Sequence, residues 1–307
     1  MLLKKHITKE RTWRYWLKLI GFGLLAFLIL GNTAYIGLHA YVFTRPAQYP
    51  VCCITPADKG FDYEDVSLTT ADGLELVGWY IPSQNRAAVI LLHGYGGNRL
   101  GMMFHAETLA NQGYGVLFYD QRASGESEGD MRSWGWLDVA DVDAAVAYLQ
   151  ARPEVDADKI GIFGSSTGAE IAIAAAARNP DIAVAGADGP GYTIQQDIVP
   201  PQSIPEAISY FDAGLLVLMM QLRSGASAPQ PLTEAVTQIT PRPLLLISTT
   251  TQFDFERRMA EQFYDLAGEP KAHWHIPEAG HGGGPSARPE AYAQRLVDFY
   301  DQAFFGE

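Results

Sequence analysis

Short apolar runs alternate with helical stretches along most of the chain. The apolar runs have the length of buried parallel strands and occupy residues 87–92, 115–119, 159–163, 182–187 and 243–247. Stretches with helical periodicity occupy residues 103–112, 136–151, 167–178, 255–266 and 289–304. This alternation predicts an α/β fold whose mostly parallel, twisted sheet is flanked by helices.

Two segments depart from the alternation. Residues 64–70 and 74–81 are rich in β-forming residues and flank Ala71-Asp72-Gly73, which predicts a hairpin before the parallel strands. Residues 189–240 contain several prolines and an apolar piece at 215–222. Inserted between two strands, this interval would form a cap over the carboxyl ends, where open α/β sheets bind ligands. Ordinary core packing is the alternative for its apolar residues.

The N-terminal segment has the pattern of a membrane anchor. Residues 19–44 carry no charge, and this uncharged segment is long enough for a helix to cross a bilayer. Basic residues precede them, and aromatic residues lie near both ends. The positive-inside bias therefore predicts a basic cytoplasmic head (1–18), a transmembrane helix (19–44), a proline-containing linker (45–60) and an extracytoplasmic domain (61–307) in the cell membrane. A signal peptide cleaved after Ala40 and a helix of a soluble protein are the alternatives.

Charge and cysteine usage narrow the function further. Residues 1–45 hold seven Lys/Arg and one Glu, so the formal charge of −13 leaves −19 for the rest. Such an acidic body repels phosphate backbones, and we expect no nucleic-acid partner. Cys52 and Cys53 are adjacent, closer than an unstrained disulfide prefers, so we expect no disulfide. No Cys/His spacing in the sequence indicates a metal site.

The segment Gly164-Ser165-Ser166-Thr167-Gly168 fits the pattern G-x-S-x-G and places Ser166 in the position of a nucleophile. It follows an apolar strand and begins an alanine-rich helix, the setting of a strained turn that lifts a hydroxyl out of a sheet. A turn of small residues without a catalytic role is the structural alternative.

A glycine-rich turn, His93-Gly94-Tyr95-Gly96-Gly97, follows the strand at 87–92. Such a loop can direct one backbone N–H at a developing oxyanion, and the residue after the nucleophile can supply the second. We predict the amides of Tyr95 and Thr167 as these donors. The His93 side chain is expected to orient the loop.

His281, in a turn of small residues that follows a strand, is the predicted general base, because imidazole titrates in the range that activating a serine requires. His105, His273 and His275 are the rival histidines, in predicted helix or strand positions. The acid should lie after residues 243–247 and before His281. Asp254 is the first choice, with Glu256 next and Asp188 as the third.

At these residues the chain resembles the α/β-hydrolase superfamily, in particular bacterial serine hydrolases related to dienelactone hydrolase and the prolyl-oligopeptidase catalytic domain. The resemblance runs from about Phe61 to Phe305 and rests on DGLELVGWYIP (72–82), LLHGYGGN (91–98), FYDQRASGESEG (118–129), GSSTGA (164–169) and PEAGH (277–281). It implies an acyl-enzyme mechanism with a Ser-acid-His triad, and structural roles for Asp120 and Arg122. The family's Gly-x-x-Asp after the seventh strand is replaced here by STTTQFDFE (248–256), with Gln252 near the expected position of the acid.

The sequence thus predicts a serine hydrolase that cleaves a carboxylic ester or related acyl bond of a small-molecule or lipid-like substrate. The mechanism needs no metal or organic cofactor. A serine peptidase of the same fold is the first alternative. A non-catalytic membrane-anchored scaffold is the second, supported by the missing Gly-x-x-Asp.

Overall fold

The computed structural model describes residues 9–45 and 47–306. Its strands are β1 (Glu64–Thr69), β2 (Glu75–Ile81), β3 (Ala88–Leu92), β4 (Gly115–Tyr119), β5 (Ile160–Ser165), β6 (Val184–Asp188), β7 (Leu244–Thr249) and β8 (Lys271–Ile276). Its α-helices are α1 (Lys9–Phe43), α2 (Met103–Ala110), α3 (Val142–Gln150), α4 (Thr167–Arg178), α5 (Ile204–Ser224), α6 (Leu232–Ile239), α7 (Phe255–Leu266), α8 (Gly284–Ala287) and α9 (Pro289–Phe305).

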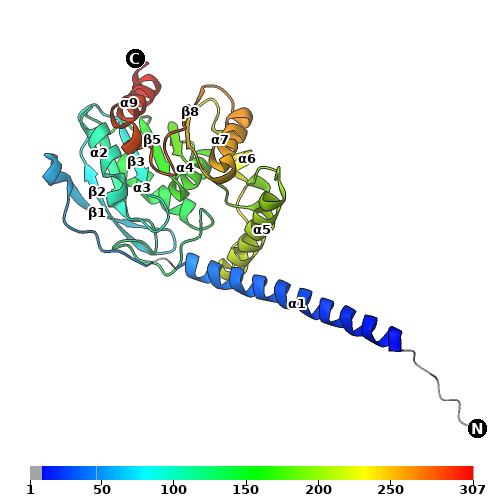
Figure 1. Ribbon diagram of the computed structural model, residues 1–307. Helices are drawn as coiled ribbons and strands as arrows, with labels where there is room; N and C mark the ends of the chain where they lie inside the picture. Colours follow the sequence, from blue (N-terminus) through cyan, green and yellow to red (C-terminus); the bar gives the residue numbers. More distant parts are fainter. Residues whose placement is uncertain (1–8, 46, 307) are drawn as a thin grey trace, which may run out of the picture.

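The strands form one sheet in the order β1-β2-β4-β3-β5-β6-β7-β8. β1 pairs with β2, and β2 with β4, in antiparallel fashion, whereas the remaining pairs from β4 to β8 are parallel. The predicted hairpin, the parallel strands and the α/β class are therefore confirmed. Figure 1 shows the helices arranged around this sheet.

Alternate residues of the central strands face two separate apolar layers, because neighbouring side chains of a strand point to opposite faces. On one face Ile90 packs with residues of α3, α4, α6 and α7. On the other face Leu91 packs with residues of α2 and α9. Packing on both faces holds the parallel strands side by side, so that their carboxyl ends lie in one row. The site described below lies at this row.

The helix predicted over 136–151 begins later, at Val142. The Ser133 hydroxyl donates to Asp138 Oδ1 (2.9 Å) and accepts from the Leu137 amide (2.8 Å). These bonds hold the preceding residues in a turn and a short 3-10 helix, Asp138–Asp141. The predicted helix start at residue 136 is therefore wrong. Side-chain hydrogen bonds hold the residues before Val142 in another conformation, and the apolar periodicity does not reveal them.

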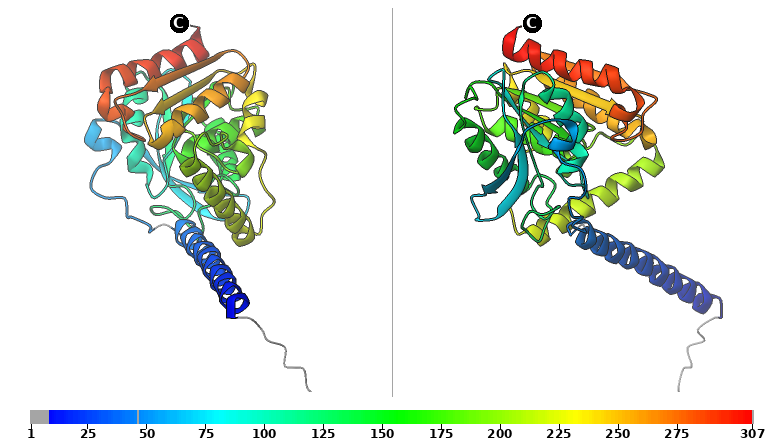
Figure 2. Two further views of the ribbon diagram at one scale, coloured as in Figure 1. Left: turned by 45° about the vertical axis from the view of Figure 1, so that its right-hand side comes forward. Right: turned by 90° about the vertical axis from the view of Figure 1, so that its left-hand side faces the viewer.

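The interval 189–240 divides into two parts. Leu232 and Val236 of α6 are buried in the layer that contains α4, so α6 belongs to the body of the domain. α5 lies outside that layer, at the edge of the body beside α1 (Figure 2). The cap within the insertion is therefore formed by α5 and the loops next to it.

α1 extends away from the sheet and its surrounding helices, and its N-terminal end lies farthest from them (Figure 1). Residues Trp13–Phe43 have a mean hydropathy of 1.9 and the length to cross a membrane. Ile36 and Ala40 are buried against α5, whereas most of the preceding turns are exposed. Of the predicted basic head, residues 1–8 lie outside the described part of the chain.

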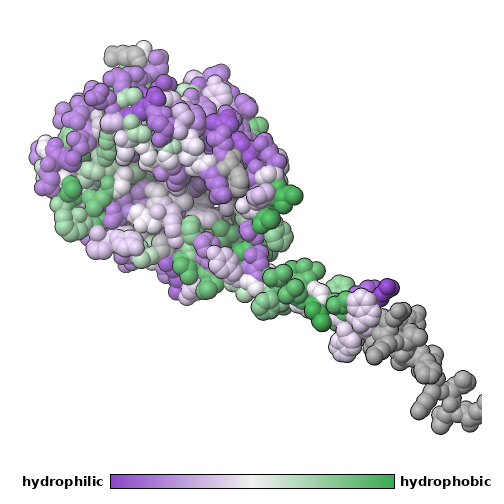
Figure 3. Space-filling model, in the orientation of Figure 1, coloured by the Kyte–Doolittle hydropathy of each residue, from purple (hydrophilic) through white to green (hydrophobic). Residues whose placement is uncertain are grey.

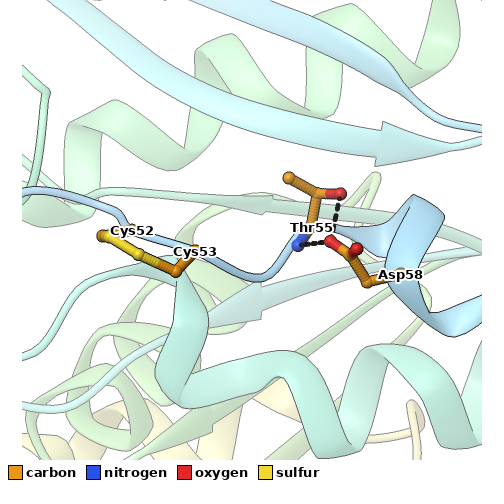
Figure 4. Close-up of a disulfide and its surroundings, with 4 residues drawn as sticks. All are labelled: Cys52, Cys53, Thr55 and Asp58. Carbon is orange, nitrogen blue, oxygen red and sulfur yellow. Dashed lines mark hydrogen bonds between the residues drawn. A yellow bond between two sulfur atoms is a disulfide. The ribbon is translucent and has the colours of Figure 1, made fainter.

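The linker holds a feature that contradicts the expectation from spacing. The sulfur atoms of Cys52 and Cys53 are joined, as Figure 4 shows, with the two Cα atoms 3.6 Å apart. The disulfide closes a small ring around the peptide bond between the two residues. After it, Asp58 accepts hydrogen bonds from the Thr55 amide (2.8 Å) and hydroxyl (2.9 Å), which starts the short helix Pro56–Lys59.

Candidate active site

Ser166 lies in the sharp turn between β5 and α4. Its backbone has φ 54° and ψ −123°, a strained conformation for a residue with a side chain. A side chain at Gly164 would collide with the backbone of Gly168, and one at Gly168 would collide with the backbone of Leu92. Both glycines of the motif are therefore required by the close approach of strand, turn and helix.

His281 faces this serine from the loop after β8. Its Nε2 lies 2.8 Å from Ser166 Oγ, so the imidazole is placed to accept the hydroxyl proton. The exposed fraction of the His281 side chain is 49%, which leaves the pair open to an entering substrate. The predicted partnership of these two residues is thus present in the geometry.

The acid partner of His281 is Glu256, and not Asp254 as we expected. Glu256 Oε2 lies 2.5 Å from His281 Nδ1, and the glutamate is almost completely buried. Its other oxygen accepts hydrogen bonds from the amide (2.5 Å) and the hydroxyl (2.8 Å) of Thr249 at the end of β7. The carboxylate is therefore fixed in place, which the orientation of a catalytic imidazole requires.

Asp254 points elsewhere because its own backbone is in the left-handed region, with φ 56°. Its carboxylate forms an ion pair with Arg257 (2.5 Å), which lowers the pKa of Asp254 through the hydrogen bond. The third candidate, Asp188, is buried and accepts a hydrogen bond from the hydroxyl of Tyr292 (2.6 Å). Burial raises the pKa of Asp188 to about 6.

Gly189, which follows Asp188, was not singled out from the sequence. Its φ is +68°, and a Cβ there would lie 3.1 Å from His281 Cε1 and 3.3 Å from Glu256 Cδ. The absence of a side chain therefore gives the His-Glu pair its space. The sequence signal was a glycine directly after a strand, which by itself is common in turns.

The hydrogen bond with Glu256 raises the pKa of His281, burial opposes this rise, and the charges of Glu256 and Asp188 add to it. Because Glu256 accepts a hydrogen bond, Nδ1 carries the proton in the neutral ring and Nε2 is free to act as the base. This is the tautomer that proton removal from Ser166 needs.

The loop after β3 lies against the nucleophile. A Cβ at Gly94 would lie 3.1 Å from Ser166 Cβ, which places the neighbouring Tyr95 amide close to the serine. Thr167 is the first residue of α4, where backbone N–H groups have no acceptor within the helix. Gly94, the residue before Tyr95, thus lies against Ser166, and Thr167 directly follows it, while the role of the two amides as oxyanion donors stays a prediction.

The buried side chain of His93 holds this loop through two polar contacts. Its Nε2 accepts from the Gln121 amide (3.1 Å), and its Nδ1 contacts the Gly94 carbonyl oxygen (2.8 Å). Burial and the charge of Arg132 lower the pKa of His93 to about 3, so the ring is neutral. These contacts agree with an orienting role for His93.

Arg132, which the sequence did not single out, is buried behind the same loop. It donates to Gln121 Oε1 (3.0 Å) and to the hydroxyls of Ser124 (2.9 Å) and Thr167 (3.4 Å). Its backbone amide also donates to the carbonyl of Thr44, just after α1 (2.8 Å). The arginine therefore connects the nucleophile turn with the end of the N-terminal helix.

The remaining candidate residues have structural partners. His105 Nε2 contacts the hydroxyl of Tyr292 (3.2 Å) in the core, and the rings of His273 and His275 contact Ser248 (2.9 and 3.0 Å). Asp120 accepts from the guanidinium of Arg99 (2.6 Å), and Arg122 forms ion pairs with Asp72 and Asp141. None of these contacts includes Ser166.

A cavity of about 390 Å³ opens beside Ser166 and His281. Its apolar wall comes from the insertion and α7, through Tyr192, Ile198, Val199, Tyr210, Ala213 and Phe255. Glu170 also lines it and accepts a hydrogen bond from the Gly191 amide (2.9 Å). Burial raises the pKa of Glu170 to about 8, so this carboxyl is mainly neutral at pH 7. The cavity thus suits an apolar group attached to a reacting carbonyl.

The sheet order, the strained serine turn and the His-Glu pair define a hydrolase of the α/β-hydrolase superfamily, and the chain is a member of that superfamily. A family model described as serine aminopeptidase, S33, matches residues 83–223. The chain is 27% identical to the uncharacterized protein YfhR of Escherichia coli (strain K12) over 243 residues, which cover 77% of this chain and 80% of that protein.

Solved structures agree with this assignment. The esterase Pf2001 of Pyrococcus furiosus superposes with a TM-score of 0.69 at 28% identity, covering 85% of this chain and 98% of the esterase. A membrane phospholipase A, described as a bacterial virulence factor, superposes with a TM-score of 0.58 and covers 96% of this chain and 99% of its own. At 17% identity, this second likeness concerns the fold alone.

Proposed function

We propose that this protein hydrolyses carboxylic esters or related acyl compounds through an acyl-enzyme on Ser166. The observation that carries the proposal is the continuous hydrogen-bonded row from Ser166 Oγ through His281 to Glu256, with distances of 2.8 and 2.5 Å. The similarity to an esterase of Pyrococcus furiosus supports the same reaction class.

In the proposed mechanism, His281 Nε2 takes the proton from Ser166 Oγ as the oxygen attacks the carbonyl carbon. The Tyr95 and Thr167 amides stabilise the oxyanion, and Glu256 stabilises the imidazolium. The imidazolium then protonates the leaving alcohol, and the acyl-enzyme remains. Water, deprotonated by His281, attacks the acyl carbon, the bond to Ser166 Oγ breaks to release the carboxylic acid, and the imidazolium returns its proton to Ser166 Oγ.

The apolar wall of the cavity favours an acyl chain or aromatic group over a charged one. A serine peptidase of the same fold is the second candidate, because the matching family model describes an aminopeptidase. An aminopeptidase needs a group that binds a free amino terminus. Glu206 lines the cavity, but its carboxylate is already paired with Arg258 (2.6 Å). This pairing favours the ester over the peptide substrate.

A substrate series separates the candidates. The full-length protein should hydrolyse p-nitrophenyl esters, with kcat/KM rising from acetate to a medium-length acyl chain as the cavity fills. Aminoacyl p-nitroanilides should be cleaved at least about a hundredfold more slowly. A preference for the anilides would replace the esterase by the peptidase. Absence of both activities, with the protein folded, would favour the non-catalytic scaffold.

We further propose that α1 anchors the protein in the cell membrane, with the basic head in the cytoplasm and the catalytic domain outside. The length and apolar composition of α1 support a span, and the basic residues before it support the orientation. Protease added to intact cells or spheroplasts should digest the domain. Protection of the domain, while an external control protein is digested, would reverse the orientation.

A further inference from the structure

The cap helix α5 carries an exposed apolar stripe. Ile204, Phe211 and Leu222 have exposed fractions of 80%, 65% and 70%. With 3.6 residues per turn, the apolar residues of the stripe fall within about 40° on either side of one line along the helix. They are the exposed residues Ile204, Ile208, Phe211, Leu218 and Leu222, together with Leu215, which is partly buried against the cluster around Ile36. A continuous apolar stripe of this kind marks an interaction surface.

The opposite side of the same helix lines the cavity beside the catalytic serine. Ser209, Tyr210 and Ala213 belong to the wall of that cavity, about half a turn away from the stripe. One helix therefore separates the apolar stripe from the substrate cavity.

No charged side chain of α5 lies within the stripe, and each has a polar partner. Glu206 pairs with Arg258 (2.6 Å), and Asp212 Oδ1 accepts a hydrogen bond from the side-chain amide of Asn32 in α1 (3.2 Å). Arg223 donates to the hydroxyl of Thr44 (2.6 Å). The stripe itself can therefore enter an apolar medium without burying Glu206 or Arg223, and Asp212 at its edge keeps a polar partner in Asn32.

The position of α5 along α1 identifies that medium. About 20 helical residues cross the hydrocarbon core of a bilayer, so a span that starts at Leu19 ends near Leu38. Asn32 and Ile36 lie before that point, and both contact α5, through Asp212 and through Leu216 with Met220. The half of α5 that packs against α1 is thus level with the outer end of the span.

Apolar side chains also join the two helices where they pack together. In Figure 3 hydrophobic residues are visible both on α1 and on the part of the body where Figure 1 places α5. Met219 of α5 approaches Gly37 of α1, next to the stripe residues Leu215 and Leu218. The stripe therefore begins beside the segment that we propose to span the membrane.

We infer that the exposed stripe of α5 is inserted into the outer surface of the lipid bilayer. The cap is then a second membrane contact of the protein, and the cavity opens next to the lipid phase. This inference rests on the proposed span of α1. Under the proposed function it selects acyl compounds that reside in the membrane, such as esters of long-chain acids, as the substrate class.

Lipid contact can be measured without any reference to activity. A full-length Cys52→Ser/Cys53→Ser chain would carry one cysteine at a time, labelled with an environment-sensitive fluorophore, in phosphatidylcholine vesicles with or without doxyl-labelled lipid. Phe211→Cys and Leu222→Cys report on the stripe. Leu24→Cys reports on the span, and Leu266→Cys on α7 is the matched control, because it is also an exposed leucine of a helix.

Doxyl lipid should quench the fluorophores at positions 211 and 222 at least half as strongly as the one at position 24. The fluorophore at position 266 should stay unquenched. Quenching at 211 and 222 no stronger than at 266 would overturn the inference, even if their emission is shifted to the blue by a second copy of the chain. An unquenched position 24 would refute the span itself, and catalytic inactivity of the protein would leave both readings unchanged.

Discussion

At the scale of single residues, the backbone conformation between β7 and α7 determines which carboxylate faces His281. Asp254 occupies the left-handed region and turns its carboxylate to Arg257. Glu256, two residues later, returns to the end of β7 and is held there by Thr249. The longer side chain thus supplies the buried carboxylate, although it starts from within the helix.

Substituting these two acidic residues should separate their roles. Glu256→Gln can donate an amide proton to His281 Nδ1 and so favour the tautomer in which Nε2 cannot accept a proton. In a related triad the corresponding amide substitution lowers kcat by about 10⁴, and we expect a loss of several orders of magnitude with a modest change in KM. Asp254→Asn is the control and should stay within about tenfold of wild type, the effect of about 1.4 kcal/mol. The reverse ranking, measured by steady-state ester hydrolysis, would return the role to Asp254.

The same variants should differ in their pH profiles. His281 acts as a base only when neutral, and its hydrogen bond with Glu256 raises its pKa above the usual 6.5. Activity should therefore fall as the pH decreases through this raised pKa. In Glu256→Gln the acid limb of kcat/KM should move to lower pH, whereas Asp254→Asn should leave it in place. An unmoved limb in Glu256→Gln would show that another group controls the titration.

The residue scale also limits what the sequence could predict. The two glycines of the G-x-S-x-G motif identify Ser166, and the glycines around His281 indicate a loop at that position. Both could be predicted because these residues are the ones that the turns require. The choice between Asp254 and Glu256 depends on a positive φ at Asp254, which is uncommon for residues other than glycine and has no sequence signal here. Gly189 and Arg132 contribute through contacts between distant segments, which no local pattern records.

At the scale of elements, the end of α1 contacts the loop that carries a predicted oxyanion donor. The ring of Phe43 stacks on that of Tyr95 with a centroid distance of 3.8 Å and an interplanar angle of 2°. It also meets Trp134 edge to face, with 4.6 Å between the centroids. The N-terminal helix therefore packs on part of the candidate site.

Removing this contact should lower the rate of ester hydrolysis. An aromatic pair contributes about 0.5–1.5 kcal/mol beyond its buried area, so Phe43→Ala should reduce kcat by about two- to tenfold as the Tyr95 loop loses its support. Phe22→Ala is the same change on an exposed position of α1 and should leave kcat unaltered. Equal kcat values in both variants and wild type, measured in membranes, would mean that the contact does not position the loop.

Elements with a clear apolar period were predictable, since the strands and helices of the sheet layers bury the residues that define the period. The helix α5 was recognised only as an apolar piece at 215–222. Pro205 makes its start look like a loop, but a proline in the first helical turn removes an N–H that has no helical acceptor. The Ser203 side chain accepts from the Glu206 amide and completes that start.

At the scale of the whole molecule, the N-terminal helix, the cap and the nucleophile turn are connected. α1 packs on α5, α5 lines the cavity, and Arg132 links the residue after α1 to Thr167. The overall class followed from the sequence because alternating strand and helix patterns predict a mostly parallel sheet flanked by helices. The packing of α1 on the cap could not be predicted, because it depends on side-chain contacts between segments about 180 residues apart.

The central claim is that Ser166 is an activated nucleophile, and covalent labelling tests it most directly. Full-length protein treated with a fluorophosphonate probe should become labelled, because His281 activates Ser166 Oγ to attack phosphorus. Ser165→Ala, the neighbouring serine outside the glycine frame, should still be labelled, whereas folded Ser166→Ala should not. Labelling that persists in Ser166→Ala, or wild-type protein that never reacts, would contradict the account.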